Sequence, residues 1–257
     1  MNDTVADLVG RPLRLLLSLC LFGGLWQLAA IGIGNEVLLP GPLDVGRALA
    51  ALPADGALLR DVLASLKRVF TGFLLAAGIA VPLALVLAYV KPLQQLLLPI
   101  ISLLRPIPPI AWIPLAILWF GIGDKPSYFI TTLAAFFPIF LNAHAGGLAV
   151  EARHLHAARF LGAGRWRVIR TIYLPSALPQ IWTGLRIGLG QSWMAVVTAE
   201  LIAAQSGLGY MIQISRINLE TSHVLVGMLT IGVLGALMTA LLSYAERFVL
   251  PWQQIQR

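Results

Sequence analysis

The chain has 257 residues, of which 58% are hydrophobic and 11% charged, and its mean hydropathy is +0.85. This is far more apolar than the near-even balance of a soluble domain, so the composition indicates a protein that lies in a lipid bilayer. The net charge of +7 indicates membrane orientation rather than nucleic-acid binding, because no basic patch with interleaved aromatic residues accompanies it. Cys20 is the single cysteine, which excludes an internal disulfide and a cysteine metal site.

Six apolar stretches are close to the length of about 20 residues that crosses a bilayer. The first follows Arg11 and Arg14 and exceeds the apolar core of a signal peptide, about 7 to 15 residues, so we expect an uncleaved span. With the N-terminus inside, 10 Lys and Arg residues fall in inner segments and 6 in outer ones. The positive-inside rule therefore predicts that both termini are cytoplasmic. The stretches cover residues 13–33, 69–90, 96–120, 127–148, 181–204 and 224–249.

Residues 35–61 form the long outer segment of this topology. The turn at residues 39–42, Leu-Pro-Gly-Pro, is followed by Val45, Leu49 and Leu52, a spacing that indicates a short amphipathic helix on the membrane surface. A plain linker is the alternative. Neither an internal repeat nor a low-complexity segment is evident, so we expect one integral domain over residues 1–257.

The third apolar stretch is rich in proline. Each proline inside a helix removes a backbone donor and frees carbonyls that need partners within the protein or at a water-filled cavity. This predicts a broken helix beside a transport pathway, the alternative being a kinked helix that only packs. Arg105 attracts an anion in the first interpretation, or else anchors the helix end among lipid headgroups. The candidate pathway residues here are Arg105, Pro108, Pro109 and Trp112.

The long loop at residues 149–180 is basic and is predicted to be cytoplasmic. Gly162 and Gly164 divide it into two short helices, because glycine closes a helix in a left-handed conformation. The first helix carries the small pair Ala157 and Ala158, which permits close approach of another protein surface. In the second, Trp166, Ile169 and Tyr173 are spaced to share one helix face.

The fifth stretch carries polar residues deep in the membrane. Gly184, Gly188 and Gly190 form a small-residue face that lets helices approach closely. Glu200 lies in the outer half of the span and either lines an outer gate, binds a substrate ammonium group, or is a buried acid paired with a nearby donor. The further candidates expected to face the interior of the helix bundle are Gln191, Trp193, Thr198 and Glu200.

No pattern in the chain predicts catalysis. The four histidines are dispersed without the context of a metal site, and there is neither a phosphate-binding loop nor a recognisable nucleophile triad. We therefore expect a non-catalytic chain that holds no metal or cofactor.

The spacing of the basic loop resembles the Glu-Ala-Ala motif in the membrane subunits of bacterial ATP-binding-cassette (ABC) importers. The chain departs from the motif at one position, where His156 stands in place of the leading Glu. In the family this loop is a coupling helix that docks in a cleft of a cytoplasmic ATPase subunit. The resemblance implies that role for His156, Ala157, Ala158, Leu161, Gly162, Ala163, Arg165, Trp166, Ile172, Leu174 and Pro175.

The resemblance covers nearly the whole chain and is greatest to the taurine, sulfonate and nitrate permeases. It is carried by residues 104–115, by the Trp-Phe-Gly-Ile-Gly run at 119–123, and by residues 183–190, 199–204 and 207–210. Taurine or an alkanesulfonate is the favoured solute, and nitrate, bicarbonate and pyrimidine precursors are alternatives. The fold implied is all-α, the type I ABC importer transmembrane fold with about six spans.

The resemblance also implies an assembly in the bacterial inner membrane. The partners would be a second copy of the chain, two ATPase subunits that bind ATP and magnesium, and an extracytoplasmic substrate-binding protein. No nucleic acid is expected. The competing interpretation is a stand-alone secondary transporter or channel whose basic loop anchors to anionic lipid, although such proteins usually show an inverted repeat.

Overall fold

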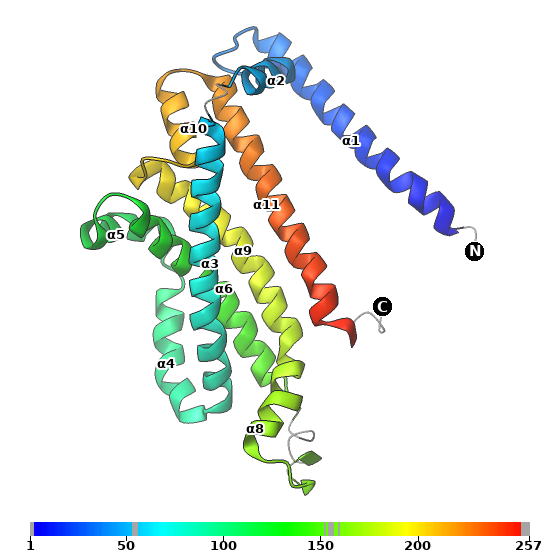
Figure 1. Cartoon of the computed structure of the whole chain (residues 1–257), viewed down its shortest axis with the longest axis vertical. Helices are drawn as coiled ribbons and strands as arrows, with labels where there is room; N and C mark the ends of the chain where they lie inside the picture. The colour runs from blue at the N-terminus through cyan, green and yellow to red at the C-terminus, as the bar shows by residue number, and fades with distance from the viewer. Residues whose placement is uncertain (1–2, 53–55, 152, 154–156, 159, 253–257) are drawn as a thin grey trace. The chain divides into compact units, whose positions relative to one another are not determined.

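The structure is a computed structural model that describes residues 3–52, 56–151, 153, 157–158 and 160–252, without the side chains of residues 3–13, 15 and 165. Every regular element in these ranges is helical, which confirms the predicted all-α class. The elements are shown in Figure 1: α1 (Asp3–Ile33), α2 (Pro42–Ala51), α3 (Ala57–Tyr89), α4 (Lys91–Leu104), η1 (Pro109–Trp112), α5 (Ile113–Phe120), α6 (Asp124–Leu148), α8 (Arg165–Val168), η2 (Ile169–Tyr173), α9 (Leu174–Ala203), α10 (Leu208–Ile217) and α11 (Thr221–Val249).

The helices provide four to six membrane spans. Four are single helices that are long and apolar enough: α3, α6, α11, and α1 over Leu16–Ile33. Two more spans arise if each of two bent helix pairs crosses once. One pair is α4 with residues 109–120, bent by 89°, and the other is residues 166–203 with α10, bent by 47°. The predicted total of six is reached when both bent pairs are counted.

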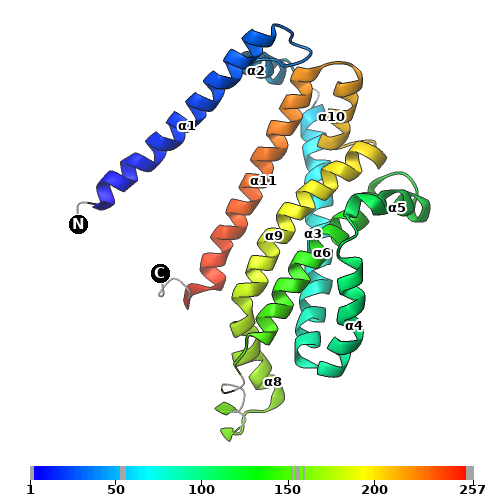
Figure 2. The same cartoon turned by 180° about the vertical axis from the view of Figure 1, so that it is seen from behind.

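The chain forms two compact units, one of residues 1–58 and 211–229, the other of residues 59–210 and 230–257. In the second unit, α3 and α9 each pack closely on α6 (Figure 2). A Cβ atom added to Gly72 of α3 would lie 2.6 Å from the Cβ of Thr131 in α6, and one added to Gly188 of α9 would lie 2.7 Å from Ile139. These glycines therefore set the helix separations. By contrast, a Cβ on Gly190 would meet nothing within 4 Å, so Gly190 does not share that close contact.

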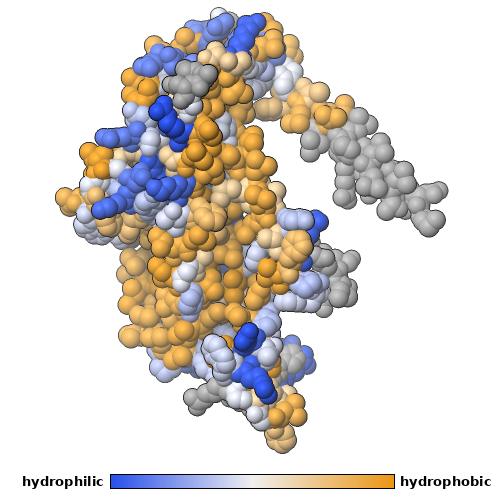
Figure 3. Space-filling view, viewed as in Figure 1, coloured by the Kyte–Doolittle hydropathy of each residue, from blue (hydrophilic) through white to orange (hydrophobic). Residues whose placement is uncertain are grey.

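Hydrophobic side chains cover much of the outer face of this second unit. Figure 3 shows them over α3 and α4. Their exposed members on α3 include Phe70, Leu74 and Ile79. Large apolar side chains in contact with solvent would be costly, so this face is suited to lipid.

We expect Gly72→Ala to destabilise the protein by about 1–3 kcal/mol, the usual cost of overpacking. The added methyl group meets Thr131, whose β-branched side chain is fully buried and cannot move aside. Gly78→Ala on the same helix is the matched control, because its Cβ would meet nothing within 4 Å. Unfolding of the detergent-solubilised protein by SDS measures the difference, and equal midpoints for the two variants would contradict the close α3–α6 contact.

The first unit contains α1, α2 and the start of α11. The indole Nε1 of Trp26 in α1 donates to the carbonyl of Pro40 at 3.0 Å, next to the start of α2. Proline begins α2, where a missing N–H is tolerated, and the Asp44 carboxylate accepts from the Gly41 N–H at 3.0 Å. The predicted short helix after the turn is confirmed, and its placement on the membrane surface stays a prediction.

The second predicted span, residues 69–90, lies within a longer helix. Lys67 and Arg68, which the predicted topology counts among the outer residues, belong to the same helix, because α3 begins at Ala57. Arg68 is only 2% exposed. An arginine is tolerated within such a helix only where partners neutralise its charge, and those partners come from distant parts of the chain.

Candidate functional site

The third predicted span is broken at its prolines, as expected. The helix α4 ends at Leu104, and the N–H of Arg105 still donates to the Ile101 carbonyl at 3.1 Å. Pro108 then takes an extended conformation, and a single turn of 3-10 helix leads into α5. Because proline lacks an N–H and disfavours helix at the residue before it, the run of prolines accounts for the 89° bend.

Aromatic contacts hold the short helix α5 against the start of α6. The ring of Phe129 in α6 lies 6.5 Å from Trp112, 5.8 Å from Trp119 and 5.7 Å from Phe120, measured between ring centroids. Contacts of this kind add to the apolar burial. In addition, Ile113 and Ala116 of α5 are buried against α6 and α9. The bent segment is therefore packed against two spans rather than free.

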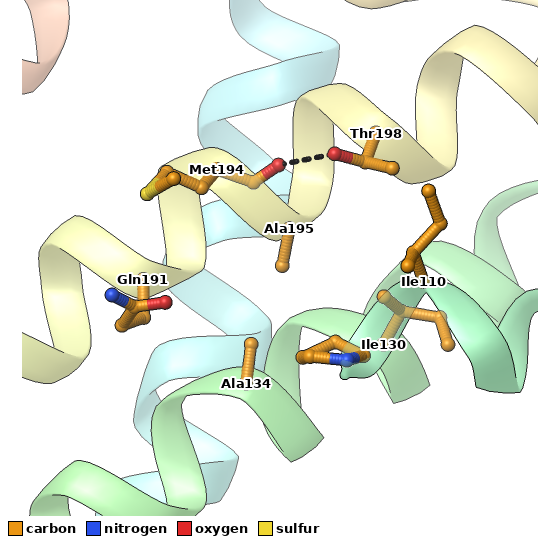
Figure 4. A pocket seen from close by; sticks show the side chains of 8 residues that line it. Ile110, Ile130, Ala134, Gln191, Met194, Ala195 and Thr198 are labelled. Atoms are coloured by element: carbon orange, nitrogen blue, oxygen red, sulfur yellow. Dashed lines mark hydrogen bonds between the residues drawn. The ribbon is translucent and has the colours of Figure 1, made fainter. Parts of the chain in front are cut away.

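A pocket of about 220 Å³ lies where the bend meets α6 and α9 (Figure 4). Gln191 and Thr198 provide its polar side chains, and the Thr198 hydroxyl donates to the Met194 carbonyl at 2.8 Å. Gln191 is exposed, and its amide has no hydrogen-bond partner among the described residues. Among the described residues, those that line the pocket are all uncharged. They are Pro109, Ile110, Ile130, Ala134, Gln191, Met194, Ala195 and Thr198.

The structure brings three of the predicted pathway residues, Pro109, Gln191 and Thr198, to this pocket and places the others elsewhere. Pro108 and Arg105 are exposed and do not line it, and Trp112 packs on the buried cluster beside it. Trp193 and Glu200 are buried on the opposite side of α9. Residues 191, 194 and 198 are separated by three and four positions, so they share one helix face, whereas 193 and 200 belong to another.

Glu200, near the C-terminal end of α9, belongs to a buried ion cluster in the second unit. The Arg68 guanidinium donates to Glu200 at 2.7 Å and to Asp124, the first residue of α6, at 2.5 Å. Ser65 also donates to both Glu200 oxygens, at 2.9 and 2.8 Å. The side chain of Glu200 is fully buried, whereas that of Asp124 is 45% exposed. This geometry corresponds to a paired, buried acid rather than to an acid facing the pocket.

The same cluster supplies hydrogen bonds to the break between α9 and α10. The N–H groups of Gly207 and Leu208 donate to Asp61 and Ser65 at 2.7 and 2.9 Å. The Gly209 N–H donates to Glu200 at 2.9 Å. Arg68 donates to the Ser206 carbonyl at 2.6 Å. Since unpaired backbone groups are costly in lipid, the cluster is what makes this broken span tolerable.

Sequence reasoning missed Arg68, although a signal for it exists. Asp61, Ser65 and Arg68 continue the helical spacing of Gly72 and Ala76, so the polar positions extend the packed face of α3 toward the N-terminus. The basic pair at 67 and 68 masked this pattern because adjacent charges are typical of a loop.

The basic loop contains a helix end of the predicted kind. Residues 157, 158 and 160 are helical, and Gly162 has a φ of 78°. The N–H of Ala163 donates to the Ala158 carbonyl at 3.0 Å, which with a left-handed glycine is the Schellman type of helix end. We call residues 157–166 the docking segment. His156 lies outside the described residues, as does the side chain of Arg165.

The apolar side chains of the docking segment face outward. Phe160 is 96% exposed, Leu161 87% and Trp166 74%. Ala157 and Gly162 are also exposed, and Ala158 and Ala163 are partly buried. Large exposed apolar groups, close in the sequence to small alanines, are typical of a protein contact.

The second short helix of the loop is not separate from the fifth span, contrary to the prediction. Helix α8 runs through a π-helical turn, η2, directly into α9, past Pro175 and Pro179. Trp166 and Tyr173 therefore do not share an environment, because Tyr173 is only 5% exposed. The π turn holds more residues per turn than an α-helix and shifts the facing of the residues that follow it. Ile172, Leu174 and Pro175 lie in or just after this turn.

The described helices are those of a protein that crosses a membrane several times. Over residues 80–252 the chain matches the family of inner membrane components of binding-protein-dependent transport systems, and it belongs to that family. The chain is a multi-pass inner-membrane protein and an ABC transporter permease subunit, which is non-catalytic. The family resemblance of the sequence is thereby confirmed.

Particular relatives narrow the kind of permease. A probable ABC transporter permease protein of Brucella abortus is 39% identical over 97% of this chain and 98% of its own length. The taurine transport system permease protein of Escherichia coli is 37% identical over 88% and 84% of the two chains. The nitrate import permease protein of Synechocystis is 30% identical over 89% and 86%. A chain of the MetNI methionine ABC transporter in an inward-facing conformation has the same fold, with a TM-score of 0.64, 24% identity and coverage of 77% of this chain and 97% of that one.

Proposed function

We propose that this permease imports a small anionic or zwitterionic solute, with taurine or an alkanesulfonate favoured over nitrate, bicarbonate or a pyrimidine precursor. The docking segment is the observation that carries the importer mechanism. It combines a Schellman helix end at Gly162 with exposed Phe160 and Leu161, on a chain of the permease family. The relatives named for taurine and nitrate support the class of solute.

The proposed assembly contains two copies of the chain, two cytoplasmic ATPase subunits and an extracytoplasmic binding protein. Each docking segment would seat in one ATPase subunit, which binds the ATP and magnesium, so this chain needs no cofactor of its own. Both termini would then lie in the cytoplasm, in agreement with the distribution of Lys and Arg.

The pocket at the bend in the third span is the proposed section of the pathway. Among the described residues that line it, the polar side chains are those of Gln191 and Thr198, and both are neutral. A charged solute would gain no ion pair there, so we infer weak holding during passage and selection of the solute by the binding protein. The unpaired Gln191 amide would otherwise be costly at this depth, which favours water or solute as its partner.

Copurification and energy dependence test the importer mechanism against a stand-alone transporter or channel. We expect the affinity-purified permease to bring down an ATPase subunit, and uptake into cells to stop when ATP is depleted. Purification without an ATPase, together with uptake that survives ATP depletion, would exclude the proposal. For the solute, we expect taurine or an alkanesulfonate to raise the Tm of the cognate binding protein more than nitrate, bicarbonate or pyrimidines do.

Replacement of Ala158 by Leu should uncouple ATP hydrolysis from uptake. A bulky group on this partly buried alanine would disturb the small surface available for docking, while the chain remains inserted. Gly162→Ala should have a similar effect, because its φ of 78° disfavours any residue with a Cβ atom. Gly164→Ala is the matched control, since Gly164 has no positive φ and its Cβ would meet nothing within 4 Å. Normal coupled uptake in the first two variants would remove the docking role.

A further inference from the structure

Three helices meet at one side chain just beyond the docking segment. Tyr173 lies in the π turn before α9, is 5% exposed, and donates its hydroxyl to the Leu85 carbonyl of α3 at 3.1 Å. Its ring packs edge-on against Tyr89 at the end of the same helix, with 5.8 Å between ring centroids. Tyr173 therefore makes both a polar and an aromatic contact with the end of α3.

The end of α6 closes on the same hydroxyl. A Cβ atom added to Gly147 would lie 2.6 Å from the Tyr173 oxygen and 2.7 Å from the Cβ of Ala88 in α3. A Cβ added to the neighbouring Gly146 would lie 2.8 Å from the carbonyl of Ala177 in α9. Because neither glycine has a side chain, α6 packs in close contact with Tyr173 and with the start of α9.

The last two residues of the docking segment, 165 and 166, are joined to this junction by continuous helix, after the turn at residues 161–164. From Arg165 the chain is helical through the π turn and into α9. A displacement of this end of the docking segment would therefore be carried along a continuous helix to Tyr173 before it reaches the remainder of the span. π turns in α-helices occur frequently at functional sites. The other end of α6 begins at Asp124 in the ion cluster, so α6 connects this junction with that cluster.

We propose that Tyr173 is a positioning residue that transmits movement of the docking segment to the ends of α3 and α6. This inference rests on the proposed function, because it requires that an ATPase move the docking segment. The hydroxyl carries the link to α3, and the absence of side chains at Gly146 and Gly147 carries the link to α6. If the ring of Tyr173 served only for packing, its hydroxyl would not be needed. Removal of the hydroxyl oxygen alone therefore distinguishes a positioning role from packing.

The test uses the complete transporter in proteoliposomes, with its ATPase subunits and binding protein, and the variant Tyr173→Phe. We expect assembly and ATP hydrolysis to be retained, while the ATP consumed per solute imported rises by about fivefold or more, the lower range of a typical coupling energy. Tyr244→Phe is the matched control, because Tyr244 is 59% exposed on α11 and makes its ring contact with Phe248. We expect the control to keep the wild-type ratio.

A second variant tests the contact of Tyr173 with α6. Gly147→Ala should also raise the amount of ATP consumed per solute imported. The double variant Gly147→Ala/Tyr173→Phe should show a smaller rise than the two single variants added together, because removal of the Tyr173 oxygen relieves the 2.6 Å contact. If Tyr173→Phe consumes as much ATP per solute imported as the wild type, the proposal is wrong. Loss of ATPase binding in Tyr173→Phe would also overturn the proposal, because Tyr173 would then be part of the docking surface. If the wild-type chain itself bound no ATPase, the proposed function would fail instead.

Discussion

Replacement of Arg68 by Met is expected to destabilise the permease by about 3–5 kcal/mol, the usual cost of leaving one partner of a buried ion pair alone. Glu200 would keep its bonds to Ser65 and the Gly209 N–H but would lose the 2.7 Å contact with its counter-charge. Since the side chain of Glu200 is fully buried, water cannot replace the guanidinium. Unfolding by SDS and the amount of protein inserted in the membrane measure this effect.

The matched control also removes the negative charge of Glu200, which Arg68 balances. Glu200→Gln keeps an oxygen that accepts from Gly209, so the double variant Arg68→Met/Glu200→Gln should be more stable than Arg68→Met alone. Asp124→Asn should cost less than Arg68→Met, because Asp124 is 45% exposed and water screens its contact. If the double variant is no more stable than Arg68→Met, the buried pair is not what makes Arg68 necessary.

Gly207→Ala should have the second large effect. The residue has a φ of 105°, and an added Cβ would lie 2.5 Å from the carboxyl carbon of Glu200 and 2.7 Å from the Arg68 guanidinium. The substitution would therefore combine backbone strain with displacement of the ion pair. We expect a loss of several kcal/mol, from about 1–3 kcal/mol of strain plus the cost of a disturbed buried pair. The same SDS unfolding measurement applies.

Gly121→Ala separates these two contributions. Gly121 has a φ of 76°, but its Cβ would meet nothing within 4 Å, so this variant shows the strain of a positive φ without a clash. We expect it to be clearly more stable than Gly207→Ala. Equal losses in the two variants would mean that the contact with Glu200 and Arg68 contributes nothing.

The sequence predicts most of the local features because each has a local cause. Proline lacks a backbone N–H, so the break after α4 could be placed at residues 105–109 before the fold was known. Glycine tolerates a left-handed backbone, so the helix end at Gly162 could be placed as well. The π turn before α9 has no such marker, and the sequence therefore did not predict that Trp166 is exposed while Tyr173 is buried.

The pathway candidates show where local reasoning reaches its limit. Gln191, Trp193, Thr198 and Glu200 all lie on one helix, and polarity alone predicts that each faces the bundle interior. The rotation of α9 about its axis decides which of them reach the pocket, and that rotation is fixed by Gly184 and Gly188 against α6. Gln191 and Thr198 line the pocket as a result, whereas Trp193 and Glu200 are buried elsewhere.

By itself, the sequence determined the solvent, the class and the family of this protein. Apolar runs of spanning length require lipid. The spacing of residues in the basic loop resembles the permease motif, and this motif can be recognised in the sequence because its residues are close together in the chain. Only the tertiary structure decided the partner of Glu200, since Arg68 is 132 positions away in the chain and was counted in an outer segment. A buried charge is stable only when its counter-charge is brought to it, and that meeting depends on the packing of α3, α6 and α9 rather than on any local pattern.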